Sequence, residues 1–495
     1  MLSSRKPLIG SSLLALIGAF ALAAVHQYLF FDHNPGISFI IFIVFLYVYL
    51  FHDWKGRLKE ATGFAWFLFA VILLLALTYG LFYNPIFRAL NLLAIPGLVF
   101  VHLAVLRGSN RIPWWDIRIV GEALAHLIPR SLLQIPRVFR TLRAALFRRL
   151  DGERQKTATK IVIGLAFATP LLFVVIPLLA SADGAFNKLL NGIPGWMSRF
   201  SLGELFGRTL WIVVFGILFA IYYWSFAKPP RPRKAATDKE DISSSPKPSI
   251  DSVVLTTLLL AVNAVYVLFV VIQFSYLFGA WDGMLPDGTT YAEYARRGFG
   301  ELVAVSAINF ALLIVSLTFS GTRKGFLNFL LYVLVGCSGV MLYSAYIRLA
   351  MYEEAYGYTY IRFLVHAFMI YLAFLLLIAA LRIRTSLVPM AKCFIILSLA
   401  AYTLLNYVGM DRLIAEYNIA RFEETGKIDR YYLNNLSADA IPTLVDFAVK
   451  RQDAELKELL VNRRARLIDE SRDWQSFNLS VYSAKKAVQT ISNPN

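Results

Sequence analysis

Long apolar runs constrain the fold of this chain more than any other feature. They lie at residues 8–31, 37–51, 63–83, 86–106, 161–179, 204–226, 253–280, 302–320, 326–347, 363–381 and 391–408. A helix needs ~20 apolar residues to cross a bilayer, and inside lipid only a helix or a closed barrel satisfies its own backbone hydrogen bonds. The sequence therefore predicts an all-α, polytopic transmembrane helix bundle of about 11 spans, counted from hydropathy.

Composition and charge placement narrow the class of protein further. The chain is 58% hydrophobic and 16% charged, whereas soluble proteins are roughly 45–50% apolar and about 25% charged. The net charge of +17 lies mainly in loops between the runs, where basic residues determine topology, so we expect no nucleic-acid partner. Cys337 and Cys393 fall in or beside apolar runs. No metal or cofactor motif is present, and we expect neither a metal nor a cofactor.

A polar segment divides the chain into two membrane halves. Residues 228–251 are rich in Pro, Ser and charge, which is typical of a disordered linker. Residues 1–227 then form an N-terminal membrane half with spans one to six, and residues 252–409 form a C-terminal half with spans seven to eleven. Residues 410–495 balance acidic and basic side chains and contain several helix signals. We expect them to form a small outward-facing helical tail domain.

The distribution of Lys and Arg predicts the orientation of the chain. Basic residues concentrate at the N-terminus, in segment 107–160 and in the linker, which places these on the cytoplasmic side. An odd number of spans then puts the C-terminus outside. Segment 107–160 alternates arginines with apolar residues, so it is either an amphipathic segment bound to anionic lipid headgroups or a structured cytoplasmic loop. We expect the bilayer and its anionic headgroups to be partners.

Charged residues gather at the outer ends of the spans. Two stretches stand out, 348–366 and 291–301, and ionisable groups so close to lipid are costly unless they face protein or water. No residue is assigned a catalytic role. The candidate ligand-binding residues are Asp183, Glu293, Arg296, Arg297, Glu301, Arg348, Tyr352, Glu353, Glu354, Tyr356, Arg362, His366, Tyr417 and Arg421.

Several interpretations of this charged face remain open. The charges can be interhelical ion pairs of a membrane scaffold, or they can line an outward-facing, Tyr-rich pocket that binds a polar or anionic ligand. In the second case we expect Arg348, Glu353 and Glu354 to lie beside Glu293, Arg297 and Glu301 in one pocket. A receptor or transport-type protein of the cell envelope is the reading we favour. A membrane enzyme acting on a lipid-linked envelope substrate is a further alternative.

Five ordered motifs between about residues 32 and 442 carry a family resemblance. They are Ser181-Ala-Asp183-x-x-Phe186, Tyr291-x-x-Tyr294-Ala-Arg296-x-Gly298-Phe299, Tyr352-Glu-Glu-Ala-Tyr-Gly357, Tyr417-Asn418-x-x-Arg421 and Leu436-Ser437-x-Asp439-Ala440-Ile-Pro442. Together they resemble a family of uncharacterised bacterial multi-pass membrane proteins, a domain of unknown function. The resemblance implies a location in the bacterial cell (inner) membrane. It implies no activity and transfers no catalytic residue.

Overall fold

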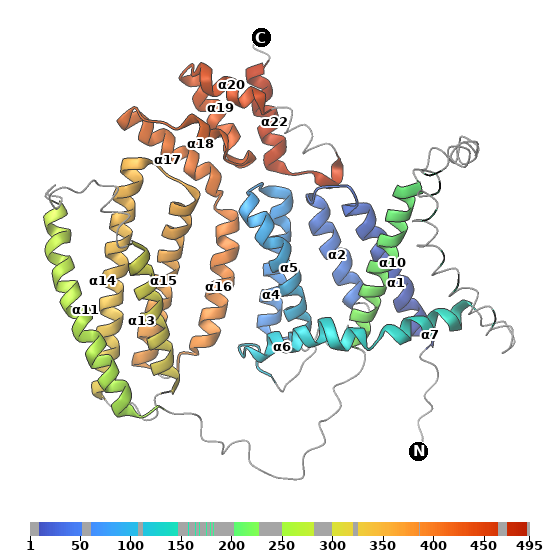
Figure 1. The fold of residues 1–495 in the computed structure, drawn as a ribbon, viewed down its shortest axis with the longest axis horizontal. Coiled ribbons are helices and arrows are strands. Elements are labelled where there is room, and N and C mark those ends of the chain that lie inside the picture. The colour runs from blue at the N-terminus through green and yellow to red at the C-terminus, as the bar shows by residue number, and fades with distance from the viewer. Residues whose placement is uncertain are drawn as a thin grey trace. The chain divides into compact units, whose positions relative to one another are not determined.

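Every element in the described part of the chain is a helix. The computed structural model describes residues 9–51, 61–106, 112–146, 202–226, 250–281, 299–319, 325–385, 387–463 and 473–492, together with a few single residues between 157 and 182. The all-α class is confirmed for these residues (Figure 1). The predicted fifth span and most of the predicted linker lie outside them.

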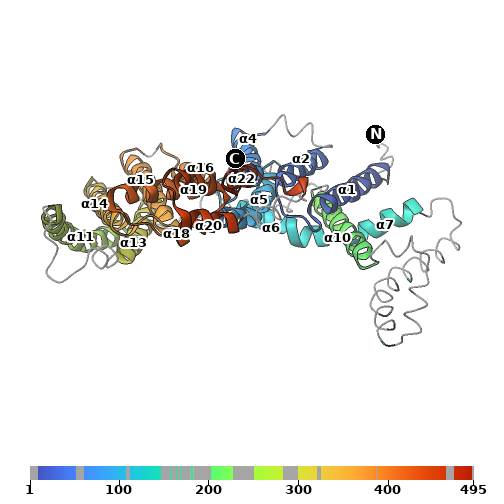
Figure 2. The same ribbon diagram turned by 90° about the horizontal axis from the view of Figure 1, so that it is seen from above.

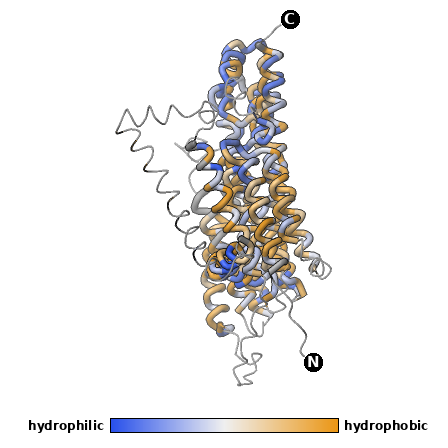
Figure 3. Tube along the Cα trace, turned by 90° about the vertical axis from the view of Figure 1, so that its right-hand side faces the viewer, coloured by the Kyte–Doolittle hydropathy of each residue, from blue (hydrophilic) through white to orange (hydrophobic). Residues whose placement is uncertain are grey.

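Eight of the helices are long and apolar enough to cross a membrane. They are α1 (Ile9–Phe30), α4 (Gly63–Leu81), α5 (Pro85–Leu106), α10 (Leu202–Ser225), α11 (Ser252–Trp281), α14 (Gly325–Tyr356), α15 (Tyr360–Arg384) and α16 (Met390–Tyr407). Two more helices, α2 (Ile37–Phe51) and α13 (Phe299–Phe319), are also apolar, but their apolar parts are too short to be counted among these eight. Figure 3 shows hydrophobic residues running along the long helices and more hydrophilic residues towards the C-terminus. These are the helices of an integral membrane protein; the count of about eleven stays a prediction.

The chain divides into two compact units. The first consists of Met1–Gly80, Ala94–Arg233 and Asp473–Phe477, and the second of Leu81–Leu93, Lys234–Arg472 and Asn478–Asn495. Helix α5 contributes to both units, because the division falls after Leu93. The predicted boundaries at 227, 251 and 409 follow chain order, whereas these units combine segments distant in sequence.

Close packing of α1 against α10 forms the core of the first unit. Ala15, Ala19 and Trp224 are buried there. A Cβ on Gly216 of α10 would lie 2.8 Å from the Phe20 ring of α1, so this approach depends on the missing side chain. Small residues serve the same purpose at many helix contacts in membranes, since lipid gives no hydrophobic driving force between helices.

The basic segment of the first unit is helical and amphipathic. It contains α6 (Arg118–Ala125), the π-helix η1 (His126–Arg130) and α7 (Ile135–Leu146). Pro129 lies inside η1; proline cannot donate the usual backbone hydrogen bond, which fits a locally widened turn. Buried His126 contacts Ser225 of α10 at 3.0 Å from its Nδ1, and it stacks on Phe226. The segment therefore packs one face against the spans of its own unit.

Leucine packing and amide hydrogen bonds hold together the membrane helices of the second unit. Leu259 of α11, Leu313 of α13 and Leu331 of α14 are fully buried in one cluster. The Asn263 Nδ2 atom donates to the Leu330 carbonyl at 2.8 Å, and the Asn309 Nδ2 atom donates to Ser338 Oγ at 2.9 Å. Such side chains link neighbouring helices, where water cannot compete.

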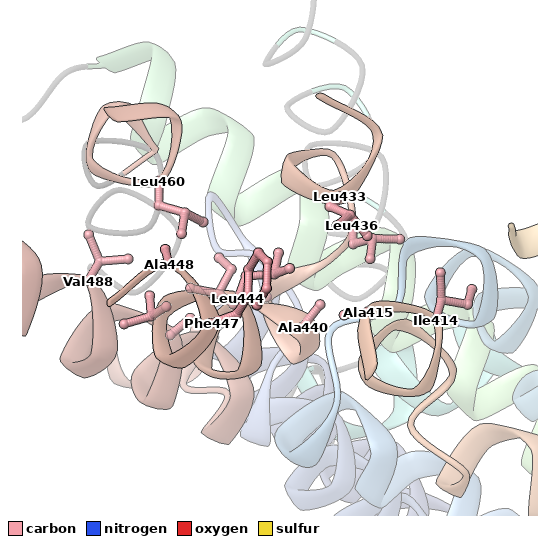
Figure 4. Packing of buried hydrophobic residues seen from close by; sticks show 14 of the residues in the cluster. Ile414, Ala415, Leu433, Leu436, Ala440, Leu444, Phe447, Ala448, Leu460 and Val488 are labelled. Carbon is pink, nitrogen blue, oxygen red and sulfur yellow. The ribbon is translucent and has the colours of Figure 1, made fainter. Parts of the chain in front are cut away.

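The C-terminal helices share a separate hydrophobic core in the second unit. They are α17 (Met410–Thr425), α18 (Arg430–Asn434), η2 (Ala438–Ala440), α19 (Ile441–Lys450), α20 (Ala454–Asn462) and α22 (Leu479–Ser492). Leu436, Ile441 and Leu444 are completely buried among them, and Phe87 of α5 belongs to the same cluster. Figure 4 shows Leu436 and Leu444 in this core. Local signals fix the helix starts: Ser437 caps η2, and Asp453 caps α20 through the backbone N–H of Leu456. Figures 1 and 2 show these helices gathered at the end of α16. The remaining short helix, η3 (Trp474–Ser476), belongs to the first unit.

Candidate functional site

The charged stretch 348–366 is mostly helical. Helix α14 continues to Tyr356 instead of ending near residue 347, and α15 begins at Tyr360. Arg348, Tyr352, Glu353, Glu354 and Tyr356 therefore occupy the last turns of α14. The first turns of α15 carry Arg362 and His366. The two helices meet as an antiparallel pair at this end.

Glu353 and His366 form a buried acid–base pair across this helix junction. The Glu353 side chain is 2% exposed, and its Oε2 atom lies 3.1 Å from Nδ1 of His366. The other two polar atoms, Glu353 Oε1 and His366 Nε2, are buried without a hydrogen-bond partner among the described residues. The Tyr346 ring packs 4.6 Å from the imidazole. A buried polar atom without a partner is costly, so this pair has the capacity to bind a water molecule, a ligand or a proton.

The adjacent carboxylate, Glu354, has a different environment. Glu354 is exposed, and it bonds to α17 through its backbone carbonyl and not through its side chain. Nε of Arg421 donates to the Glu354 carbonyl at 2.7 Å, and Nη2 donates to the Ala355 carbonyl at 2.6 Å. Carbonyls at a helix C-terminus have no partner within the helix, and a cation there also complements the helix dipole. Arg421 of α17 thus caps α14.

Gly357 and Asn418 complete this cap. Gly357 has φ +82°, and a Cβ there would lie 2.5 Å from Asn418 Oδ1. That oxygen accepts from the Tyr358 N–H at 3.0 Å, and Asn418 Nδ2 donates to the Tyr358 carbonyl at 2.9 Å. The motif ending at Gly357 and the motif Tyr417-Asn418-x-x-Arg421 therefore form one structural junction between α14, α15 and α17.

Aromatic contacts account for most of the other predicted residues near this junction. The guanidinium of Arg362 lies over the Tyr352 ring at 4.0 Å and also donates to the Gly357 carbonyl. Tyr417 packs its ring 5.0 Å from Tyr358, and Tyr356 packs 5.2 Å from Tyr352. These contacts stabilise the link between helices, so their role is structural. They are cation–π and aromatic contacts and not the interhelical ion pairs considered from the sequence.

The second predicted stretch cannot be placed against the first. Asp183, Glu293, Arg296 and Arg297 lie outside the described residues, and only the backbone of Glu301, in α13, is described. Arg348 is half-buried on α14. The shared pocket of Arg348, Glu353, Glu354 and the 293–301 stripe therefore stays a prediction.

Sequence reasoning missed a buried carboxylate at the start of α17. Asp411 is 0% exposed. It accepts hydrogen bonds from Asn84 Nδ2 at 2.6 Å, from the Ser437 N–H at 2.8 Å and from the Tyr360 hydroxyl. Asn84 in turn caps α5 by accepting from the Phe87 N–H at 3.0 Å. Asp411 thus ties together α5, α15, α17 and η2, and nothing in the local sequence distinguished it from an exposed helix-start aspartate.

Asp439 is a second buried carboxylate in this region. Its two oxygens accept from the Tyr83 N–H at 2.9 and 3.2 Å. Burial raises the pKa of the Asp439 carboxyl, although hydrogen bonds from Ser480, Tyr83 and Ser437 act in the opposite direction. This aspartate lies in the last of the five motifs. Its contacts explain that motif as an attachment point for Tyr83, in the link that precedes α5, within the second unit.

Comparison with known proteins identifies the family of the chain. Residues 69–447 match a family model described as "Domain of unknown function (DUF4153)". That range includes the Glu353–His366 pair, the α14 cap and Asp411. No curated protein and no solved structure matches the chain. Since the family model covers most of the sequence, the chain belongs to the DUF4153 family of proteins whose function is unknown.

Proposed function

We propose that this membrane protein is a transport-type ligand-binding protein, and that its site is built on Glu353 and His366. The observation that carries the proposal is the buried pair itself. One carboxylate oxygen and one imidazole nitrogen, both without a partner in the described structure, lie at the junction of two candidate spans. Ionisable residues within membrane helices usually mark ion, proton or substrate pathways. A polar ligand, or a proton with water, can satisfy both atoms.

Neutral polar atoms on α14 and on the helices packed against it favour a transporter over a receptor. Asn263 Oδ1, Asn309 Oδ1, Ser316 Oγ and Ser344 Oγ are each buried without a partner among the described residues. Asn263 of α11 contacts α14 at Leu330, and Asn309 of α13 contacts it at Ser338. A cavity of about 10 Å³ beside Ser338 offers roughly the volume of one water molecule. Buried polar atoms of this kind are where internal water binds, and such water supports proton movement through a span.

The contacts around Gly357 limit the extent of the proposed site. Tyr352, Arg362, Tyr417 and Arg421 are engaged in the junction of α14, α15 and α17, so we assign them a structural role in place of ligand binding. The alternative of a structural membrane scaffold therefore applies to these four residues of the charged face. Glu353 and His366 form the proposed site, and Arg348, five residues before Glu353 on α14, is proposed as a further ligand-binding residue. No observation favours an enzyme.

Proton flux in proteoliposomes tests the proposal. The full chain is reconstituted around a pH-sensitive dye, and an acid pulse is applied outside. We expect the interior to acidify faster than in protein-free liposomes, and we expect Glu353→Gln to slow this by about tenfold, since it removes the group that exchanges the proton. Glu354→Gln, an adjacent exposed change, should match the wild type. Wild-type flux equal to that of empty liposomes, or undiminished flux in Glu353→Gln, would contradict the proposal.

The proposed orientation follows from the positive-inside rule. With the N-terminus and linker cytoplasmic and an odd number of spans, the C-terminus is extracytoplasmic. A single cysteine at position 249 should then be protected from a membrane-impermeant maleimide in intact cells, in a background with Cys337 and Cys393 replaced. A cysteine at position 492 should be labelled. The reverse pattern would reject the orientation, and equal labelling of both would indicate an even number of spans.

We also propose that the amphipathic segment lies on anionic lipid headgroups. Ile117, Leu124, Leu133 and Phe139 are more than half exposed. They lie on or directly beside helices whose other face packs against their own unit, and arginines flank them. A peptide covering 130–149 should bind anionic vesicles and dissociate as salt rises, because the Debye length is only ~10 Å at 0.1 M. Replacing Leu133 and Phe139 by alanine should weaken binding at least about tenfold, since each buried side chain contributes ~1.5–3 kcal/mol. Equal binding to neutral vesicles would show that the negative charge of the lipid does not contribute to binding.

A further inference from the structure

A large open cleft lies among the C-terminal helices, away from the Glu353–His366 pair. Its volume is about 790 Å³, which is within the range of small-molecule sites. Its lining comes from α17, η2, α19 and α22, together with Leu81, Phe82 and Gly409. All of these residues belong to the second unit. The cleft is therefore a feature of one compact body.

Leu81 and Gly409 place this cleft at the level of lipid headgroups. Leu81 is the last residue of the candidate span Gly63–Leu81, and Gly409 follows the candidate span Met390–Tyr407 closely. Spans end where the hydrocarbon meets the headgroup region. Leu81 and Phe82, with Pro442 and Leu479, give the cleft apolar surface. An acyl chain can rest against such a surface.

The polar lining selects among headgroups by charge. Arg412 is the single basic residue in the lining, and Glu416, Asp439 and Asp446 are acidic. This excess of carboxylates disfavours a purely anionic headgroup, since like charges repel without a compensating cation. Arg412 still offers a fork of donors that suits a phosphate. The lining thus suits a ligand that carries both a phosphate and a cation.

The existing ion pairs leave these groups available to a ligand. Arg412 Nε lies 2.7 Å from Glu416 Oε1, and Lys450 Nζ lies 2.7 Å from Asp446 Oδ2. Both pairs are exposed and join residues four apart on one helix, and such pairs contribute little to stability. A ligand can therefore replace either partner at small cost. Thr443, Ser480 and Ser483 add neutral hydrogen-bonding groups to the lining.

We propose that this cleft binds the headgroup of an aminophospholipid, the phosphoethanolamine type. Its phosphate would be held by Arg412, and its primary ammonium by Asp446 and Glu416. A primary ammonium has three N–H donors for the carboxylates, whereas the quaternary ammonium of a choline headgroup has none. The cleft should therefore prefer ethanolamine lipid over choline lipid of the same acyl chains.

Lipid competition on the purified full chain tests this proposal. The protein is equilibrated with an equimolar mixture of phosphatidylethanolamine, phosphatidylcholine and phosphatidylglycerol, and bound lipid is counted by native mass spectrometry. We expect about tenfold preference for the ethanolamine lipid, which corresponds to one charge-assisted hydrogen bond. Arg412→Gln and Asp446→Asn should each abolish that preference. Glu423, on the same helix as Arg412, forms an exposed ion pair with Arg451 at 2.8 Å outside the cleft, and Glu423→Gln should retain the preference.

Two further arms separate the alternative outcomes. Ser483→Leu should reduce ethanolamine lipid binding by filling the cleft without changing charge, and the melting temperature of every variant shows whether it folds. Soluble glycerophosphoethanolamine carries the headgroup without acyl chains. Added in excess, it should compete with the lipid only if the cleft recognises the headgroup alone. Equal retention of ethanolamine and choline lipids, preference for phosphatidylglycerol, or unchanged selectivity in folded Asp446→Asn would each overturn the proposal. None of these outcomes depends on proton flux through the Glu353–His366 site.

Discussion

Replacing Asp411 by alanine is expected to destabilise the protein by roughly 3–6 kcal/mol. The substitution leaves three buried donors without an acceptor: Asn84 Nδ2, the Ser437 N–H and the Tyr360 hydroxyl. Each unsatisfied buried group costs ~1–3 kcal/mol. Folded domains are stable by only about 5–15 kcal/mol in total. The variant should therefore accumulate poorly and lose the docking of α17 on α5 and α15.

Thermal stability of the detergent-solubilised protein, followed by size-exclusion chromatography, measures this loss. Asp411→Asn should fall between the wild type and Asp411→Ala. Its amide keeps one oxygen acceptor but points an N–H group at Asn84, which cannot reverse its own amide because its Oδ1 already accepts from Phe87. Glu423→Ala provides the matched control, an exposed carboxylate on the same helix that should change stability little. Equal melting temperatures of Asp411→Ala and this control would show that Asp411 contributes nothing to stability.

The positions of most membrane helices could be predicted from the sequence because lipid leaves the backbone few choices. An apolar run of suitable length has to be helical inside a bilayer, and α2 begins and ends at the predicted residues 37 and 51. The predicted span ended near residue 347, whereas α14 continues to Tyr356. The charged stretch that begins at Arg348 had suggested that the span ends there. The helix continues because Arg421 and Asn418 from α17 satisfy the polar groups at its end, and hydropathy contains no information about that partner.

The candidate site was proposed from the charge of the stretch 348–366, since charge near lipid needs a reason, and its binding role stays a prediction. Glu353 and Glu354 could not be told apart from the sequence, because adjacent positions on a helix point about 100° apart and only the packing of α15 decides which is buried. Asp411 and Asn84 are 327 residues apart. Their contact depends on tertiary packing, and neither residue carries a local signature of it.

The second large effect is expected for Gly357→Ala, at roughly 2–4 kcal/mol of lost stability. The backbone at Gly357 has φ +82°, and a residue with a Cβ loses ~1–2 kcal/mol in such a left-handed conformation. The new Cβ would also lie 2.5 Å from Asn418 Oδ1. Asn418 would have to move and give up its two hydrogen bonds to the Tyr358 backbone, each contributing ~1 kcal/mol. The cap that joins α14 to α17 should open.

Three comparison variants separate the two contributions. Gly426→Ala meets the same backbone strain, at φ +68°, with nothing within 4 Å of its Cβ, so its loss in melting temperature measures strain alone. Gly336→Ala, within α14 and also without a neighbour, should be neutral or stabilising, because alanine favours helix by up to ~1 kcal/mol. Gly357→Ala combined with Asn418→Ala should cost less than the sum of the single changes, since the clash disappears once Asn418 is shortened. Additive losses in that pair would mean that Gly357 is required only for its backbone conformation, and that the contact with Asn418 does not hold the junction closed.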